Sequence, residues 1–197
     1  MTVSRALNAP DKLTPETLKR VREAIEQMRY VPNAMASGLR LSRARLVAAM
    51  LPTLVGPVFQ EMIQSLDSAL NRLGYQLMVG CTGYDAAHEA ELLRTVIQRR
   101  PDGIIMTGIT ASEDGRRALL ASRIPVVETW DYTDAPIDML VGFSHVAIGT
   151  AVADYFASRG HRQLGIVSGN DARAQARIQA FKARAGELGL PPVTAVS

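Results

Sequence analysis

The sequence predicts an α/β protein in which a small helical head precedes a larger domain built on a parallel sheet. From Leu46 onward, short apolar runs alternate with longer segments of helical periodicity, which is typical of consecutive βαβ units. Before Leu46 the pattern is only helical, and this segment is basic. Residues 1–45 contain nine Lys/Arg and four Asp/Glu, whereas residues 46–197 contain thirteen and fifteen. A basic head on a slightly acidic body indicates a polyanionic partner for the head.

Composition narrows the class of protein further. The chain has 197 residues, 47% of them hydrophobic, which is enough for a sizeable core. No run approaches the ~18 apolar residues that a membrane helix needs, and a secretory signal pattern is lacking, so we expect a cytoplasmic protein without a membrane partner. Cys81 is the sole cysteine, which excludes an intramolecular disulfide and a cysteine-based zinc site. The three histidines show no ligand spacing, so neither a metal nor another cofactor is predicted.

Within the head, Thr14-Pro15-Glu16 predicts the start of a helix, because it combines a hydroxyl cap, a proline in the first turn and an early acid. Apolar residues then recur at steps of three, four and three, which predicts one apolar face. This face is formed by Leu18, Val21, Ile25 and Met28. The helix should end before Tyr30, since the residue preceding Pro32 is disfavoured in a helix.

Residues 1–8 read as a shorter helix whose small apolar side docks on that face. Val3, Ala6 and Leu7 would supply this side. Thr2, Ser4 and Arg5 would then face outward. Short hydroxyls and a forked guanidinium suit phosphates and base edges in a DNA major groove.

A third helical segment, residues 33–39, is predicted to be weak. Seven residues that include Gly38 are too few for a helix that is stable alone in water. Such a segment is ordered by a partner or remains a linker. Leu39 could open a base step from the minor groove, or it could pack on the body as part of a flexible linker.

Four motifs of the head resemble the lactose repressor (LacI) family of bacterial transcription regulators: Thr2-Val-Ser-Arg-Ala-Leu-Asn8, Thr14-Pro-Glu-Thr17, Tyr30-Val-Pro-Asn33 and Ala36-Ser-Gly-Leu39. The resemblance implies that the first motif lies in the recognition helix of a helix-turn-helix. It also implies a hinge helix whose leucines, from two subunits of a homodimer, wedge the centre of the operator. The implied DNA contacts are Thr2, Ser4, Arg5, Asn8, Asn33, Ala36 and Leu39.

The chain departs from this family pattern at its start. Family members have a complete helix and turn before Thr-Val-Ser-Arg, whereas this chain begins inside the recognition helix. The first helix of such a motif braces the second across the DNA backbone. We therefore expect a partial helix-turn-helix, with the true start upstream or a shortened product.

For the body, the pattern predicts seven strands, at residues 46–51, 75–79, 103–106, 125–129, 139–143, 164–168 and 192–196. It predicts five helices between them, at residues 57–73, 86–99, 112–122, 146–158 and 172–188. Sheets of this kind often hold a nucleotide, but no G-x-G-x-x-G or phosphate loop follows a strand. No nucleophile elbow or H-E-x-x-H motif is present either. Ser144 and His145 are neighbours without an evident third partner, so we expect that the protein is not an enzyme.

Landmarks along the body also resemble the LacI family: Pro57-Val-Phe59, Arg100-Pro-Asp-Gly-Ile104, Ile124-Pro-Val-Val127, Arg159-Gly-His-Arg162 and Arg177 with Phe181. Three further motifs look most like its gluconate-repressor branch: Pro125-Val-Val-Glu-Thr-Trp130, Pro136-Ile-Asp-Met139 and Val141-Gly-Phe-Ser144. The implied fold is that of periplasmic sugar-binding proteins, with two α/β lobes and a ligand cleft between them. We therefore expect a head at 1–32, a hinge helix and linker at 33–45, a first lobe at 46–141 and the start of an incomplete second lobe at 142–197.

The effector site is expected where the parallel strands end. Thr53, Thr107, Trp130 and the loop at 169–177 lie at these ends, and the resemblance adds Phe59 at the start of a helix. Arg177, with Arg173 one turn earlier, offers a fork for a carboxylate or for paired hydroxyls. Ordinary packing is the alternative for the two aromatic residues. For Arg177 the alternative is a surface ion pair with Asp171 or Asp154.

These observations together predict a DNA-binding repressor of sugar or sugar-acid metabolism. It would act as a homodimer on double-stranded operator DNA, under the control of a small, gluconate-like effector. One alternative is a periplasmic-type small-molecule binder without DNA function, and the basic head argues against it. Another is a non-functional remnant of a repressor.

Overall fold

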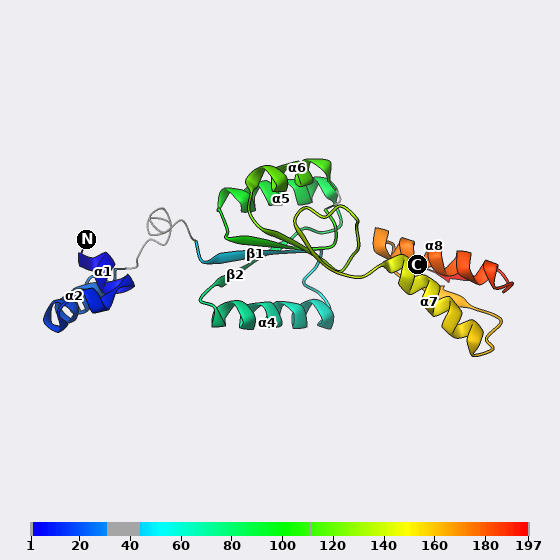
Figure 1. The fold of residues 1–197 in the computed structure, drawn as a ribbon, viewed down its shortest axis with the longest axis horizontal. Coiled ribbons are helices and arrows are strands. Elements are labelled where there is room, and N and C mark those ends of the chain that lie inside the picture. Colours follow the sequence, from blue (N-terminus) through cyan, green and yellow to red (C-terminus); the bar gives the residue numbers. More distant parts are fainter. Residues whose placement is uncertain (1, 31–43, 111, 197) are drawn as a thin grey trace. The chain divides into compact units, whose positions relative to one another are not determined.

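The computed structural model describes residues 2–30, 44–110 and 112–196. It divides into two compact units, Met1–Ala44 and Arg45–Ser197, and each is described by itself below. The predicted α/β class is confirmed, because the second unit contains a parallel sheet with helices on both faces (Figure 1). Among the described residues, no helix is both long enough and apolar enough to span a membrane.

The first unit consists of two helices joined by a short 3-10 turn. Helix α1 spans Thr2–Asn8, η1 spans Pro10–Lys12 and α2 spans Pro15–Gln27. Helix α2 starts as its sequence predicts, because the Thr14 hydroxyl accepts a hydrogen bond from the backbone N–H of Thr17 (3.4 Å) and Pro15 occupies the first turn. The turn η1 was not predicted. The predicted hinge helix at residues 33–39 lies outside the described residues.

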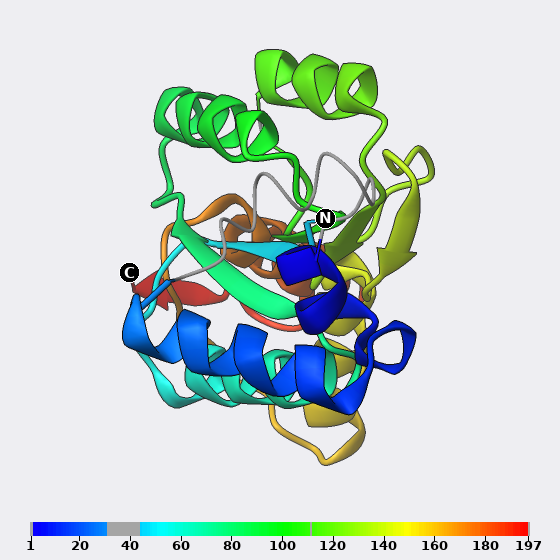
Figure 2. The same cartoon turned by 90° about the vertical axis from the view of Figure 1, so that its left-hand side faces the viewer.

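The second unit begins with five parallel strands in the order β2-β1-β3-β4-β5. They are β1 (Leu46–Leu51), β2 (Gln76–Cys81), β3 (Gly103–Thr107), β4 (Val126–Thr129) and β5 (Met139–Val141). The helices that connect them are α4 (Pro57–Arg72), α5 (Ala86–Gln98) and α6 (Glu113–Ser122). Helices α5 and α6 cover one face of the sheet and α4 covers the other, as two views show (Figures 1 and 2). We call residues 46–141 the five-stranded part.

The core of this part lies between the sheet and the helices α5 and α6. Leu93 of α5 and Leu119 of α6 pack there against Met50, Ile104 and Val126 of the central strands, and all five are almost fully buried. Apolar residues along both faces of a central parallel strand are what a sheet covered by helices requires. The sheet is therefore a rigid base, and its carboxyl ends position the candidate site described below.

The rest of the second unit is a smaller layer, which we call the two-stranded part (residues 145–196). It contains α7 (His145–Ser158), β6 (Gly165–Val167), α8 (Ala172–Glu187) and β7 (Thr194–Val196). Strands β6 and β7 pair in parallel, and helices α7 and α8 pack side by side (Figure 1). Ser144 and Asp171 cap the two helices through hydrogen bonds from backbone N–H groups (3.1 Å each).

Two glycines mark close approaches around α7. The predicted strand at 139–143 ends already at Val141, and an ideal Cβ on the next residue, Gly142, would lie 1.9 Å from the backbone oxygen of Asp131. One turn into α7, an ideal Cβ on Gly149 would lie 2.4 Å from the Arg177 carbonyl oxygen of α8. Any side chain at either position would collide with backbone. Gly149 thus sets how closely α7 and α8 pack within the two-stranded part, and Gly142 sets how closely the connecting segment approaches Asp131.

This packing predicts opposite effects for two helical Gly→Ala substitutions. Gly149→Ala should destabilise the protein by about 1–2 kcal/mol, because the added methyl group forces α7 away from α8. Gly186→Ala on α8 should be neutral or stabilise by up to about 1 kcal/mol, because open space surrounds it and alanine is the better helix former. Chemical denaturation followed by the fluorescence of Trp130, the sole tryptophan, would measure both. Equal effects of the two variants would contradict the tight α7–α8 contact.

Candidate functional sites

Helix α1 presents polar side chains on its outer face. Thr2 and Arg5 are exposed, whereas Ala6 is buried. Ser4 and Asn8 lie within α1, but their side chains are outside the described part of the structure. A short hydroxyl and a guanidinium on an exposed helix are the groups that contact DNA phosphates and base edges.

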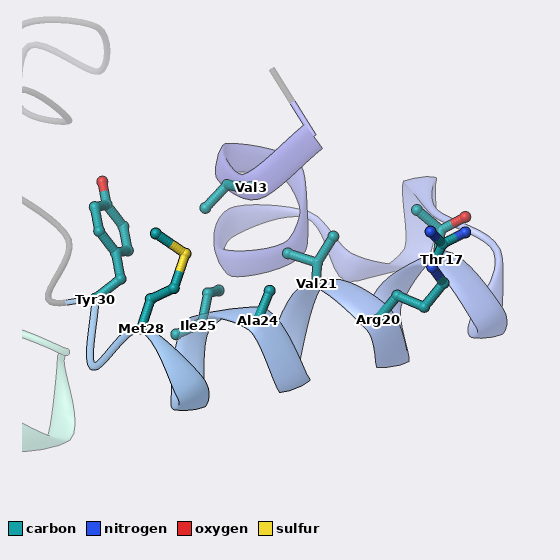
Figure 3. Close-up of a pocket in the computed structure, with 8 residues that line it drawn as sticks. All are labelled: Val3, Thr17, Arg20, Val21, Ala24, Ile25, Met28 and Tyr30. Carbon is teal, nitrogen blue, oxygen red and sulfur yellow. The ribbon is translucent and has the colours of Figure 1, made fainter.

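An apolar groove runs between α1 and α2 (Figure 3). Val3 of α1 points toward it, and Val21, Ala24 and Ile25 of α2 form its floor. Its volume is about 580 Å³, and Met28 at one end is 77% exposed. The apolar face of α2 predicted from the sequence is thus only partly covered by α1. Of the other predicted DNA contacts, Asn33, Ala36 and Leu39 lie outside the described residues.

Two aromatic residues meet in the second unit. Phe59, in the first turn of α4, stacks on Trp130, which follows β4, with ring centroids 5.8 Å apart and planes 18° from parallel. Both side chains are half-buried. Trp130 adopts a left-handed backbone (φ 64°), which is uncommon for a bulky residue and is found where surrounding structure enforces it. The stack creates a flat apolar surface beside the carboxyl end of β4, suited to the C–H face of a polyol or sugar.

His145, the first residue of α7, is the centre of a polar network. Its side chain is 6% exposed. Its Nε2 lies 3.0 Å from the Trp130 carbonyl oxygen and its Nδ1 lies 2.8 Å from Nη1 of Arg177. The carboxylate of Asp131 is 4.0 Å from Nε2, and the ring of Phe143 packs edge-on at a centroid distance of 5.1 Å. A single buried ring therefore connects the five-stranded part with α8.

The same contacts argue against hydrolytic chemistry at Ser144 and His145. The Ser144 hydroxyl accepts the backbone N–H of Ala147 (3.1 Å) as a helix cap, and both ring nitrogens of His145 are engaged by Trp130 and Arg177. A serine nucleophile needs its base at hydrogen-bonding distance. Among the described residues, no group of three or more His, Cys, Asp or Glu is placed to hold a metal ion.

Arg173 reaches from α8 toward the end of β3. Its guanidinium lies against Gly108 so closely that a Cβ there would be 3.5 Å from Nη1. Its Nε is 3.7 Å from the carboxylate of Asp171, and its side chain is 18% exposed. The ion pair that was the alternative for Arg177 is thus made by Arg173 with Asp171. The other carboxylate considered, Asp154, pairs with Arg184 (2.7 Å).

Buried hydroxyl groups lie on either side of Gly108 in the sequence, the residue that the Arg173 guanidinium contacts. Within the described ranges, the buried Oγ1 atoms of Thr107 and Thr110 have no hydrogen-bond partner. Thr107 ends β3, directly before Gly108. Buried polar atoms are nearly always paired, so two such hydroxyls at the end of a strand indicate a place where a ligand supplies the partner. Thr53, after β1, is half-buried and accepts the backbone N–H of Val55 (3.1 Å).

Tyr132 is a neighbour of this network with a shifted pKa. Its hydroxyl donates a hydrogen bond to Asp134 (2.8 Å), and this bond, together with the negative charge of Asp134, raises the pKa of Tyr132 above its ordinary value.

The structure thus brings together some of the predicted effector residues. Phe59 contacts Trp130 directly, and Trp130 and Arg177 share His145 as a partner. Thr53 makes only its local turn contact among the described residues. Sequence reasoning missed His145, Asp131 and Thr110. The only signal for His145 was a lone histidine beside a helix cap, which in isolation indicates no role.

Comparison with known proteins assigns both units of the chain. Residues 1–33 match the family described as bacterial regulatory proteins, lacI family. Residues 44–197 match the family described as periplasmic binding proteins and sugar binding domain of LacI family. The HTH-type transcriptional regulator GntR of Pseudomonas aeruginosa is 30% identical over 183 residues, covering 92% of this chain and 53% of that protein. The chain thus spans about half the length of this curated relative.

Solved structures agree with these matches. A LacI-family transcriptional regulator from Silicibacter pomeroyi is 34% identical, with a TM-score of 0.89 over 100% of this chain and 60% of that one. The lac repressor dimer, bound to operator and the anti-inducer ONPF, has a TM-score of 0.78 at 18% identity, covering 98% of this chain and 60% of that one. This second likeness shows the fold alone.

Proposed function

Because this chain belongs to the LacI family of bacterial regulators, we propose that it represses transcription by binding operator DNA through its head, under the control of an effector bound in its body. The main support for this proposal is the order of the two family matches along the chain. One chain joins a lacI-type head to a sugar-binding domain. A small-molecule binder without DNA function would have no use for the first of them.

On the DNA side, the proposal assigns Thr2, Ser4, Arg5 and Asn8 to the major groove and to phosphates. Exposed Thr2 and Arg5 on α1 support this assignment. The open apolar face of α2 also supports it, since a helix-turn-helix packs a further helix against its recognition helix. The hinge, residues 33–45, would contribute Asn33 and Ala36 to the minor groove and Leu39 as the wedge.

On the effector side, the proposal is a sugar acid such as gluconate, held by the residues at the ends of β1, β3 and β4 and by α8. Phe59 and Trp130 would cover the carbon chain, and Arg173 and Arg177 would receive the carboxylate and neighbouring hydroxyls. The unpaired hydroxyls of Thr107 and Thr110, with Thr53, would complete the site. The name GntR of a 30% identical relative supports this class of ligand.

The proposed lobes follow the two parts of the body. Residues 46–141 would form the first lobe, and residues 142–197 would belong to the second lobe. Operator binding would use a homodimer, since a symmetric dimer reads two half-sites. The lac repressor dimer of the same fold was crystallised on its operator.

The test of the effector assignment is calorimetric titration of the chain with gluconate and, separately, with glucose, a neutral sugar of similar size. The proposal expects saturable binding of gluconate and weaker binding of glucose. Tighter binding of glucose would overturn the sugar-acid assignment while leaving the regulator intact. Binding of neither would remove the proposed effector site.

The wedge assignment makes a separate prediction. Leu39→Ala should weaken binding to the operator roughly tenfold and should reduce the bend of the bound DNA, because the wedge opens a base step and a methyl group is too short to do so. Gel mobility of circularly permuted operator fragments measures both affinity and bend. Gluconate binding by the same variant serves as the control and should be unchanged. An unaltered bend would make Leu39 a linker residue.

A further inference from the structure

We propose that His145 is a positioning residue: with its proton on Nε2, its neutral ring orients the Arg177 guanidinium and joins it to the Trp130 carbonyl. The effector would then meet a surface assembled from both parts of the body. This inference rests on the proposed function, because it takes Trp130 and Arg177 to contact the effector. It assigns a role to a residue that touches those two groups without needing to touch the ligand.

The two contacts of the ring determine where its proton lies. A guanidinium can only donate hydrogen bonds, so Nδ1, which is 2.8 Å from Nη1 of Arg177, must be an unprotonated acceptor. A peptide carbonyl can only accept, so Nε2, which is 3.0 Å from the Trp130 oxygen, must carry the proton. Both conditions hold together only in the neutral Nε2–H tautomer. The partners thus specify one chemical state of the ring.

His145 lies in a closely packed segment of the chain. Before His145, the chain at Gly142 lies directly against the backbone of Asp131. After it, Gly149 lies directly against the carbonyl of Arg177. The rings of Phe143 and His145 pack edge to face, and His145 is only 6% exposed. His145 is therefore a buried residue beside the part of α8 that carries Arg177.

The consequence for Arg177 is a fixed orientation. A free arginine loses substantial rotational freedom when it binds a ligand, and a side chain already held by one hydrogen bond loses less. His145 occupies one N–H of the fork and leaves the other donors available. Arg173 differs, because its one described ion pair involves Nε and its Nη1 lies against Gly108. Both arginines are therefore held in place, Arg173 by the carboxylate of Asp171 and Arg177 by an uncharged ring.

Two amide substitutions separate this role from simple filling of space. In His145→Asn, the shorter amide places an oxygen near the position of Nδ1, where it accepts from Arg177. In His145→Gln, the longer amide places its NH₂ near the position of Nε2, where it donates to the Trp130 carbonyl but leaves Arg177 without its acceptor. If His145 only filled space, the Asn variant would have no reason to bind the effector better than the Gln variant. If His145 positions Arg177, the Asn variant should bind better, because only asparagine keeps the acceptor for Arg177.

The first measurement needs no ligand. Long-range ¹H–¹⁵N spectra of the chain labelled at its three histidines report which ring nitrogen carries the proton. We expect a pure Nε2–H signature for the buried His145, and fast averaging for the exposed His88 and His161. An Nδ1–H signature or an averaged signal at His145 would overturn the inference, whatever the chain binds.

The second measurement is a gluconate titration of the parent, His145→Asn, His145→Gln, Arg177→Lys and the His145→Gln/Arg177→Lys pair, followed by Trp130 fluorescence. We expect the Gln variant to bind roughly tenfold more weakly and the Asn variant within about threefold of the parent. The double variant should be no weaker than Arg177→Lys alone, because both changes remove the same contact.

The outcomes separate the inference from the proposed function. A parent that binds gluconate while the Gln variant binds it equally well would overturn the role of His145 and leave the effector site standing. Affinity losses that add up in the double variant would also overturn the role of His145 and leave the effector site standing. A parent that binds neither gluconate nor glucose would overturn the effector site itself. Denaturation curves identify any variant that fails to fold. In that case the Arg177→Lys titration and the histidine spectra test the role of His145.

Discussion

Arg177→Lys is expected to weaken gluconate binding by roughly 1.5–3 kcal/mol, the worth of a charge-assisted hydrogen bond. Lysine keeps the positive charge but lacks the planar guanidinium. It therefore could not donate two parallel hydrogen bonds to the carboxylate of gluconate, as Arg177 would. It also loses the hydrogen bond from the guanidinium Nη1 to Nδ1 of His145 (2.8 Å). The loss should therefore appear in affinity rather than in the fold. Calorimetric titration of parent and variant measures it.

The matched control for this prediction lies on the same helix. Arg184→Lys makes the same exchange further along α8, where the guanidinium pairs with Asp154 and Glu187. Exposed pairs of this kind contribute little, so gluconate affinity should be unchanged. A glucose titration adds a second comparison. Arg177→Lys should reduce the affinity for glucose less than that for gluconate, because glucose has no carboxylate. An Arg177→Lys variant that binds gluconate as tightly as the parent would remove Arg177 from the site.

Arg5→Ala is expected to cost about 1–3 kcal/mol in operator affinity and to lower the salt slope of binding by about one if Arg5 contacts a phosphate. Its position on the exposed face of α1 is the reason, because that face carries the polar residues of the first motif. Fluorescence anisotropy of a labelled duplex, titrated at several fixed salt concentrations, measures affinity and slope together.

Arg117→Ala is the control for the Arg5 prediction. It removes the same charge from α6 in the body, where the side chain is exposed and pairs with Asp114. If net charge alone attracted DNA, the two variants would weaken binding alike. If α1 reads the groove, only Arg5→Ala has a large effect. Equal losses would therefore contradict the assignment of α1 to the DNA.

Much of the secondary structure could be predicted from the sequence. The run at 46–51 became β1 with the same limits, because a short run of consecutive apolar residues between Arg45 and Pro52 suits a strand that helices cover on both faces. Helix α2 began where its Thr-Pro-Glu start predicted. The strand order β2-β1-β3-β4-β5 could not be read this way, since periodicity shows which residues are buried but not which strands pair. The early end of β5 depended on the backbone of Asp131, a distant contact.

The candidate site was predictable by residue type but not by contact. Trp130 and Arg177 were identified near strand ends, where ligands of open sheets bind, and Phe59 was identified through the family resemblance. Their mutual arrangement depends on His145, which a sequence presents only as a histidine next to a serine. Its two hydrogen-bond partners, Trp130 and Arg177, lie more than ten residues before and after it in the sequence. The unpaired hydroxyl of Thr110 is equally invisible before the sheet is assembled.

Selection of bound sequences from random duplexes would show whether one chain couples DNA recognition to a sugar acid. The chain would be mixed with a pool of random-sequence DNA at fixed salt, with and without gluconate, and the bound fraction sequenced. We expect an enriched sequence with two-fold symmetry, as a homodimer requires, and an enrichment that changes when gluconate is present. No enriched sequence, or an enrichment indifferent to gluconate and to glucose, would contradict this coupling.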